Sequence, residues 1–166
     1  MKCLSGYLLK EKQPDNLCEF RVAVDKVKIT KPGTDVTLVT YGSTWRIGSE
    51  AAEQLAKVGV SEKVIDMQTI IPFELSHEIA DSLKKTNRLV IIDEDVEGGT
   101  SAFILQQVLE KQKAFRFLDS EPLTISAENH RPAYASDGDY FSKPSLDDVV
   151  EKVYKLFTEI NPGKYP

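Results

Sequence analysis

Residues Val36–Tyr41 form the run VTLVTY, and residues Leu89–Ile92 form the run LVII. Both runs are apolar at nearly every position and rich in β-branched side chains, which is typical of strands that are buried on both faces of a sheet. A shorter run of the same kind, Lys63–Ile65, lies between them. Each run is followed by a turn and then by a helix-like stretch. This alternation predicts an α/β fold in which helices cover the faces of an open sheet.

The stretch after the first run carries the signals of an amphipathic helix. Apolar residues recur at every fourth position in Ile47–Leu55, which is the spacing of one helix face. Ser43 or Thr44 can cap the start of this helix. Gly59 predicts its end, because a glycine tolerates the left-handed conformation that commonly terminates helices.

Similar signals predict three more helices. Ser76 is expected to open one of them, and Thr100 or Ser101 is expected to cap another. The pair Ser145 and Asp148 resembles a capping box with Asp in the Glu position, and it precedes a well-patterned helix.

The regions outside these elements are less regular. Residues 1–19 show no sustained period and are expected to be an interdomain linker, which leaves residues 20–166 as one domain. Residues 20–29 alternate like a strand, with a bulge or bend near Asp25. Leu123–Ile125 predicts a further strand, and residues 129–144, rich in Pro, Ser, Asp and Gly, predict a loop.

The composition excludes several classes of partner. The chain has 166 residues and a formal net charge of -5, with no block rich in Lys or Arg, so no nucleic-acid partner is expected. No apolar run approaches the length that spans a membrane, so no membrane partner is expected either. Cys3 and Cys18 fit no metal-binding spacing and are expected to be reduced thiols, which favours a cytoplasmic location.

In an open α/β sheet, ligands and partners gather at the carboxyl ends of the strands. Those ends are here Tyr41–Ser43, Asp66–Thr69 and Asp93–Glu94, the last of which leads to Gly98 and Gly99. None of them contains a phosphate-binding glycine loop or the Gly-x-Ser-x-Gly pattern of a nucleophilic serine. We therefore predict no catalytic and no cofactor-binding residue.

Residues 93–97 (DEDVE) form an acidic cluster at one of these ends. Close carboxylates can raise one another's pKa by like-charge repulsion, which acid–base catalysis exploits. Acidic strand ends are also common as solvated loops or as caps of neighbouring helices, and we favour an interface or capping role for Glu94. The cluster would repel a phosphate from Gly98 and Gly99, so a tight turn or a close backbone approach explains these glycines better.

Two histidines are present, and neither has a second histidine or a cysteine at metal-ligand spacing. His77 is expected to face solvent in the first turn of a helix. His130, which precedes Arg131 in a polar loop, is the better functional candidate. No metal site is predicted.

The order of short motifs along the chain is more specific than any one of them. These motifs are GTDVTLVTYG (33–42), EAAEQL (50–55), VIDMQTIIP (64–72), SLKKTNRLV (82–90), Glu94 with Gly98-Gly99, and the loop from Pro132 to Tyr134. The series resembles the C-terminal domain of transketolase-type enzymes, and most closely the β part of 2-oxo acid dehydrogenase E1. The resemblance covers residues 20–160, and it leaves open a fused α–β E1 chain.

The resemblance implies a three-layer α/β/α fold with a five-strand mixed sheet in which one strand is antiparallel. It also implies a part of a thiamine diphosphate enzyme that decarboxylates a 2-oxo acid, with a branched-chain 2-oxo acid favoured, and that passes the acyl group to lipoyl-E2. In that family, other domains hold the diphosphate, the Mg and the pyrimidine ring. This chain alone is therefore expected to bind neither thiamine diphosphate nor Mg, and to be inactive.

The role that the resemblance implies is assembly. The expected partners are the remaining E1 domains or the α subunit, the E1 dimer partner, and a basic subunit-binding domain of E2 that would meet an acidic surface. The residues expected at an interface or at the wall of the active-site entrance are Glu94, Gly98, Gly99, His130, Arg131 and Tyr134.

Two segments depart from the family pattern. Thr100–Phe103 replaces the usual Ala-Glu pair after the double glycine, and Arg131–Tyr134 replaces a two-proline loop. The alternatives are a free-standing interaction module on the same fold and the C-terminal domain of transketolase or of deoxyxylulose-phosphate synthase.

Overall fold

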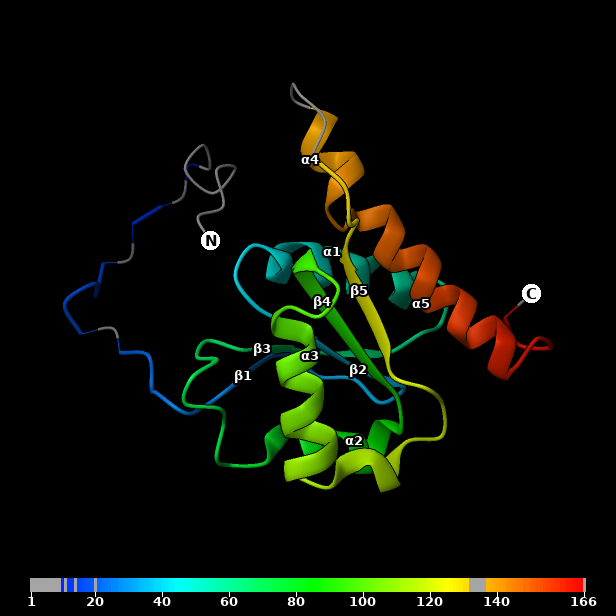
Figure 1. The fold of residues 1–166 in the computed structure, drawn as a ribbon, viewed down its shortest axis with the longest axis horizontal. Helices are drawn as coiled ribbons and strands as arrows, with labels where there is room; N and C mark the ends of the chain where they lie inside the picture. The colour runs from blue at the N-terminus through cyan, green and yellow to red at the C-terminus, as the bar shows by residue number, and fades with distance from the viewer. Residues whose placement is uncertain (1–9, 11, 14, 20, 132–136, 166) are drawn as a thin grey trace.

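The computed structural model describes residues 10, 12–13, 15–19, 21–131 and 137–165. Its strands are β1 (Lys28–Lys31), β2 (Val36–Thr40), β3 (Glu62–Asp66), β4 (Leu89–Val96) and β5 (Leu123–Ala127). Its helices are α1 (Thr44–Lys57), α2 (Glu78–Thr86), α3 (Thr100–Leu105), the π-helix η2 (Gln106–Lys111), the 3₁₀-helix η3 (Ala114–Phe117), α4 (Asp137–Ser142) and α5 (Leu146–Ile160). Figure 1 shows their arrangement.

The strands form one sheet in the order β1-β3-β2-β4-β5 (Figure 1). Strands β3, β2, β4 and β5 run parallel, while β1 pairs antiparallel with β3. The sheet is therefore mixed, with five strands and one antiparallel strand, as the resemblance implies. Because the parallel strands share a direction, their carboxyl ends lie along one edge of the sheet, which we call the carboxyl edge.

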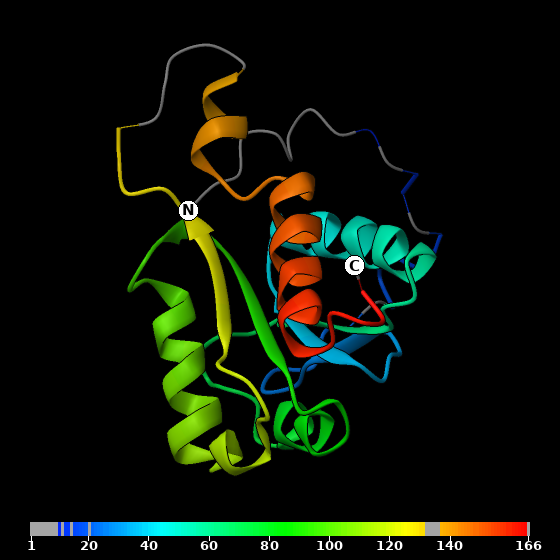
Figure 2. The same ribbon diagram turned by 90° about the vertical axis from the view of Figure 1, so that its right-hand side faces the viewer.

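Helices cover both faces of the sheet, which confirms the three-layer α/β/α architecture. Figure 2 shows α1 and α5 on one side of the sheet and α3 on the other. Successive strand residues alternate between the two layers: Leu38 packs in the core that contains α1 and α5, and Val39 packs in the core that contains α2 and α3. Both side chains are fully buried, and each such burial contributes about 1.5–3 kcal/mol.

The first strand is shorter than its sequence pattern predicts. Val22 and Val24 are exposed and lie outside any strand, and Phe20 lies outside the described residues. Asp25 has a positive φ of 64°, so the chain turns there, and β1 begins only at Lys28. The predicted bend at Asp25 is therefore present, but it ends the alternating stretch instead of interrupting a strand.

Two of the predicted helix ends are confirmed. Gly59 has a φ of 85° and follows α1, and the Val60 N–H bonds to the Leu55 carbonyl at 3.0 Å across the turn. At the start of α5, the Ser145 hydroxyl accepts from the Asp148 N–H at 3.2 Å, and the Asp148 carboxylate accepts from the Ser145 N–H at 2.9 Å. This reciprocal pair is the predicted capping box.

The other predicted hydroxyl caps are wrong. Ser43 stands just before α1 but caps none of its amides, and the Thr44 hydroxyl instead donates to the Tyr41 carbonyl at 2.7 Å. Helix α2 begins at Glu78 and not at Ser76, and the Glu78 N–H bonds to the carboxylate of Glu74 at 3.2 Å.

Helix α3 also lacks the hydroxyl cap that the sequence predicted. No side chain at its N-terminal end caps it, and the Ser101 N–H donates to the Asp93 carboxylate at 2.7 Å. Carboxylates from outside the first turn therefore replace the expected hydroxyls at α2 and α3.

Residues 129–144 also differ from the prediction of a loop, because α4 occupies residues 137–142. The Glu128 N–H bonds to the Ser142 carbonyl at 2.9 Å, which ties the end of α4 to the chain just after β5. The described part of residues 10–19 contains no helix or strand and is exposed. The assignment of residues 1–19 to a linker stays a prediction.

Candidate interface at the carboxyl edge

The parallel pairing of β2 and β4 brings two predicted strand ends together. Val39 lies opposite Ile91 in this pair, so Tyr41 and Asp93 face each other two residues further along. The Tyr41 hydroxyl donates a hydrogen bond to the Asp93 carboxylate. Burial and this hydrogen bond both raise the pKa of Tyr41, so its hydroxyl stays protonated and serves as a donor.

Asp93 connects three segments of the chain. Its side chain is fully buried, and besides the Tyr41 hydroxyl it accepts from the Asp95 N–H at 2.9 Å and from the Ser101 N–H at 2.7 Å. One carboxylate thus joins the residue after β2, the last residues of β4 and the start of α3. A buried carboxylate that accepts several hydrogen bonds is a structural anchor, because its removal would leave its donors without an acceptor.

Glu94 lies on the other side of the same strand. It is half-buried and accepts a hydrogen bond from the Ser43 hydroxyl, while Asp95 and Glu97 are exposed. The capping role that we considered for Glu94 therefore belongs to Asp93. Glu94 is held at the carboxyl edge with one face open to solvent, a position that suits contact with a partner.

The double glycine forms a tight turn. Gly98 has a φ of 85°, which side chains rarely adopt, and a Cβ on Gly99 would lie 3.1 Å from the Val96 carbonyl oxygen. Gly99 donates its N–H to that same carbonyl at 3.2 Å. A tight turn and a close backbone approach therefore account for the two glycines. From the sequence we preferred this explanation to anion binding.

The remaining predicted residues lie beyond β5, whose carboxyl end belongs to the same edge. His130 and Arg131 are exposed, and the His130 Nδ1 forms a hydrogen bond of 2.8 Å with the Arg131 carbonyl. The other histidine, His77, is exposed as expected, but it stands just before α2 and not in its first turn. Tyr134 lies outside the described residues.

Within the described ranges, no group of three or more His, Cys, Asp or Glu residues is arranged to hold a metal ion. In the same part of the chain, no helix is long and apolar enough to cross a membrane. Cys18 is a free, exposed thiol, and Cys3 lies outside the described residues.

Sequence reasoning did not find the two contacts that organise this edge. Tyr41 and Asp93 are 52 positions apart, and Ser43 and Glu94 are 51 apart. Both pairs follow from the neighbouring positions of β2 and β4 in the sheet. The only available signal was the shared place of Tyr41–Ser43 and Asp93–Glu94 at strand ends.

The family model of the transketolase C-terminal domain matches residues 25–142. The chain belongs to this family. The match covers both strands of the central pair, the acidic cluster and the double glycine. It also agrees with the fold, since a split-gene transketolase, solved as an inactive β4 tetramer, superposes with a TM-score of 0.67 over 84% of this chain and 45% of that one, at 24% identity.

Several curated relatives are β subunits of the pyruvate dehydrogenase E1 component. The chain is 32% identical to the subunit of Rhizobium meliloti over 82% of its own length and 29% of the relative. It is 27% identical to that of Mesostigma viride over 92% of its length and 45% of the relative. It is 33% identical to the mitochondrial subunit of Saccharomyces cerevisiae over 80% and 36%. The chain thus spans less than half of the length of these relatives.

Proposed function

We propose that this chain is the C-terminal domain of the E1 component of a thiamine diphosphate-dependent 2-oxo acid dehydrogenase, and that it serves assembly and not chemistry. The observation that carries the proposal is the family match together with the names of the relatives. The carboxyl edge agrees with it, because Asp93 and Tyr41 bond to each other and to backbone, as structural groups do.

The cofactor of such an enzyme does not suit the residues of this edge. A diphosphate needs backbone N–H groups or cations, whereas the glycine pair follows Glu94, Asp95 and Glu97, and the Gly99 N–H already bonds to the Val96 carbonyl. We therefore propose that thiamine diphosphate and Mg bind to other parts of the complete enzyme. The chemistry of decarboxylation and of acyl transfer to lipoyl-E2 would take place there.

The substrate is a 2-oxo acid in this proposal. The names of the relatives support pyruvate as the first substrate to assay. The preference for a branched-chain 2-oxo acid stays a prediction, which a comparison of decarboxylation rates on both substrates by the complete E1 would test.

The proposed partners are the remaining E1 domains or the α subunit, the E1 dimer partner and the subunit-binding domain of E2. Glu94, Gly98 and Gly99 are the candidates at the edge, and the exposed His130 and Arg131, which follow β5, are further candidates. A cytoplasmic location also stays a prediction, since some relatives are named mitochondrial or chloroplastic.

Calorimetry tests whether thiamine diphosphate and Mg bind to this chain or only to the complete E1. Titration of thiamine diphosphate with Mg into this chain alone should give no heat of binding, whereas the complete E1 should bind both. Micromolar binding by the chain alone would contradict the proposal. Failure of the chain to associate with the other E1 parts would favour the free-standing interaction module.

A further inference from the structure

Cations gather at the amino edge of the sheet, where β4 and β5 begin and which lies opposite the carboxyl edge. The segments that lead into these two strands are residues 82–88 and 111–118, and neither contains an Asp or a Glu. Together they contain six cations, although the whole chain has a formal net charge of -5: Lys84, Lys85, Arg88, Lys111, Lys113 and Arg116. The sequence shows no block of Lys or Arg here, because the fold is what brings the two segments together.

Four cations of this edge form a stripe across the end of α2. The Lys84 Nζ lies 5.6 Å from the centre of the Phe117 ring, and the guanidinium carbon of Arg116 lies 5.1 Å from the same centre. Lys85 follows Lys84 on α2. Burial and then the nearby charge of Lys85 lower the pKa of Lys63, which is half-buried on β3. We call Lys63, Lys85, Lys84 and Arg116 the amino-edge stripe.

Hydrogen bonds hold the backbone under the stripe in place. The side chain of Asn87, the residue after α2, donates to the Phe117 carbonyl at 2.7 Å. The Asn87 carbonyl accepts from the Asp119 N–H at 3.0 Å. These two bonds join η3 to the end of α2. A surface that is already formed binds with little loss of conformational entropy.

The dipole of α2 explains only part of the stripe. Lys84 and Lys85 lie in the last turn of α2, where cations stabilise a helix end. Lys63 belongs to β3 and Arg116 to η3, so the dipole of α2 does not account for them. In the part of the chain that the structure describes, neither Lys85 nor Arg116 forms an ion pair. Like charges that lie close together repel, and an anionic partner would offset this cost.

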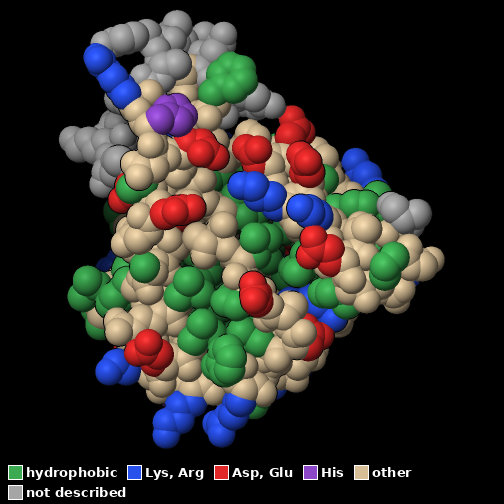
Figure 3. Space-filling model, turned by 45° about the vertical axis from the view of Figure 1, so that its right-hand side comes forward, with side chains coloured by type: hydrophobic (Ala, Val, Ile, Leu, Met, Phe, Trp, Pro, Cys, Tyr) green, Lys and Arg blue, Asp and Glu red, His purple; other side chains and the backbone are tan. Residues whose placement is uncertain are grey.

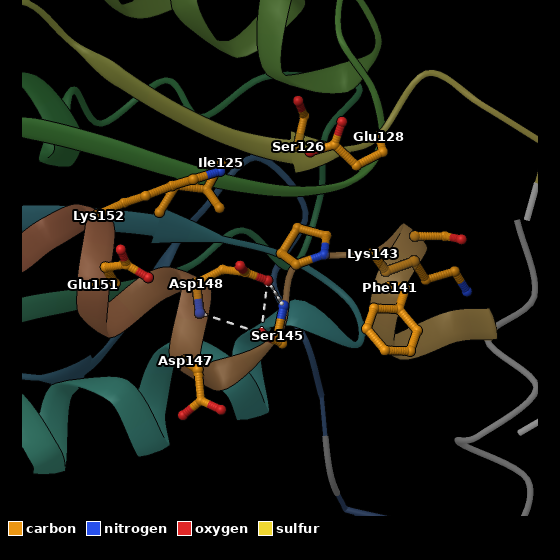
Figure 4. Close-up of a pocket in the computed structure, with 12 residues that line it drawn as sticks. Ile125, Ser126, Glu128, Phe141, Lys143, Ser145, Asp147, Asp148, Glu151 and Lys152 are labelled. Atoms are coloured by element: carbon orange, nitrogen blue, oxygen red, sulfur yellow. Dashed lines mark hydrogen bonds between the residues drawn. The ribbon is translucent and has the colours of Figure 1, made fainter. Parts of the chain in front are cut away.

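The opposite charge gathers elsewhere on the molecule. Figure 3 shows Lys and Arg side chains at the lowest point of one face, which is where α2 and η3 lie in Figure 1. Figure 4 shows a pocket between β5, α4 and α5 in which carboxylates predominate. They belong to Glu128, Asp147, Asp148 and Glu151. Because the charges are separated in this way, an anionic partner is attracted to the stripe and repelled from that pocket.

An apolar side chain lies next to the stripe in the sequence of η3. Phe115 directly precedes Arg116, and its side chain is 69% exposed. Aromatic side chains are among the residues that contribute most to the binding energy of protein interfaces. The amino edge therefore offers a row of cations together with an aromatic contact.

We propose that the amino-edge stripe binds a short acidic polypeptide segment that carries an apolar side chain for Phe115. Charge complementarity favours an anionic occupant. Two carboxylates border the stripe. Asp81, one turn earlier on α2, pairs with Lys84 at 2.6 Å, and Asp119 pairs with Arg88 at 2.7 Å. A long polyphosphate chain or an anionic membrane would meet both carboxylates, whereas a short peptide can end before it reaches them. The inference goes beyond the proposed function and does not depend on it.

The test measures the binding of a short fluorescent peptide in which Glu residues flank one Leu. The 166-residue chain should bind this Glu peptide and should not bind a matched peptide in which Gln replaces every Glu. The double variant K85E/R116E should bind the Glu peptide about tenfold more weakly than the unmodified chain, and the difference should shrink as salt rises.

K152E/K155E is the matched control. It changes the net charge by the same amount, and both side chains are exposed on α5, outside the stripe. It should bind the Glu peptide like the unmodified chain. F115A should bind it several-fold more weakly, because the apolar contact is lost. All the altered side chains are exposed, and unchanged Tm values would show that the fold is intact.

Three outcomes would overturn the inference. If K85E/R116E and the K152E/K155E control bind the Glu peptide equally, the stripe is not the binding site. If the Gln peptide binds as tightly as the Glu peptide, charge does not drive the association. If a single-stranded oligonucleotide or phosphatidylserine vesicles bind more tightly than the Glu peptide and K85E/R116E loses that binding, the stripe serves another class of partner. None of these outcomes bears on the E1 assignment, which the calorimetry tests separately.

Discussion

Replacing Glu62 should show how a buried carboxylate makes the stability of this fold depend on pH. Glu62 is the first residue of β3, its exposed fraction is 0%, and neither carboxylate oxygen has a hydrogen-bond partner in the part of the chain that the structure describes. Burial raises the pKa of Glu62 to about 7, although the nearby Lys31 lowers it in part. The Lys31 ammonium itself donates to the Ala52 carbonyl at 2.5 Å.

The raised pKa of Glu62 determines whether stability rises or falls with pH. Between the ordinary pKa of 4.5 and the folded value of about 7, the native state binds more protons than the unfolded state, so stability falls as pH rises. The loss begins near the ordinary value and is complete above the folded value. Between pH 5.5 and pH 8.5 the linkage relation gives a loss of about 2 kcal/mol from this single group.

Replacing Glu62 with Met keeps much of the side-chain volume and removes the charge. Urea unfolding of the unmodified chain and of E62M at pH 5.5 and pH 8.5 measures the effect. The stability of E62M relative to the unmodified chain should rise by about 2 kcal/mol between the two pH values.

E53Q is the matched control for this experiment, because Glu53 is exposed on α1. Its stability relative to the unmodified chain should not change with pH. Parallel pH profiles for E62M and the unmodified chain would refute the reasoning. They would mean that other interactions in the folded state offset the cost of burying the charged Glu62 carboxylate.

Three further substitutions test other parts of the fold. T37V removes a buried hydroxyl that bonds to Ser82 and Thr86, each at 2.7 Å, and should lower the free energy of unfolding in urea by about 1–3 kcal/mol; a loss below the fitting error would show that water replaces these bonds. S145A should lower it by about 1 kcal/mol through loss of the α5 capping box, and an unchanged midpoint would argue against that box. D93A should lower it by about 3 kcal/mol or more, because three donors lose their acceptor, and a smaller loss than for T37V would contradict the anchor role.

The features that sequence predicted correctly depend on neighbours along the chain. The capping box joins Ser145 and Asp148, three residues apart, and the end of α1 depends on Gly59 itself. The buried runs of β2 and β4 are continuous, so their apolar pattern needs no tertiary information. Local chemistry therefore suffices for the fold class and for these helix ends.

The helix caps that the sequence missed depend on which side chain reaches the helix amides in space, although the residues involved are only four and eight positions apart. The caps of α2 and α3 come from Glu74 and Asp93, which reach helix amides from outside the first turn. A hydroxyl at the expected position is a reasonable cap only when no carboxylate is closer, and the sequence does not show that distance. Asp93 is buried and Glu94 is more exposed, and this difference also depends on spatial neighbours that the sequence does not show.

The burial of Glu62 and the presence of α4 were unpredictable for a related reason. A charged residue at the start of a strand is usually exposed, and only the packing of neighbouring segments buries Glu62 completely. Helix α4 lies in a stretch whose Pro, Ser, Asp and Gly content predicted a loop.

Asp93 has a consequence for motion as well as for structure. The amides of Asp95 and Ser101 bond to the two oxygens of this one carboxylate, which also accepts from the Tyr41 hydroxyl, so displacement of the Asp93 side chain frees the end of β4 and the start of α3 together. Their hydrogen-exchange protection should therefore be lost at a common free energy, although they belong to different elements. A partner that presses on the double glycine would meet a surface that responds as one cooperative unit.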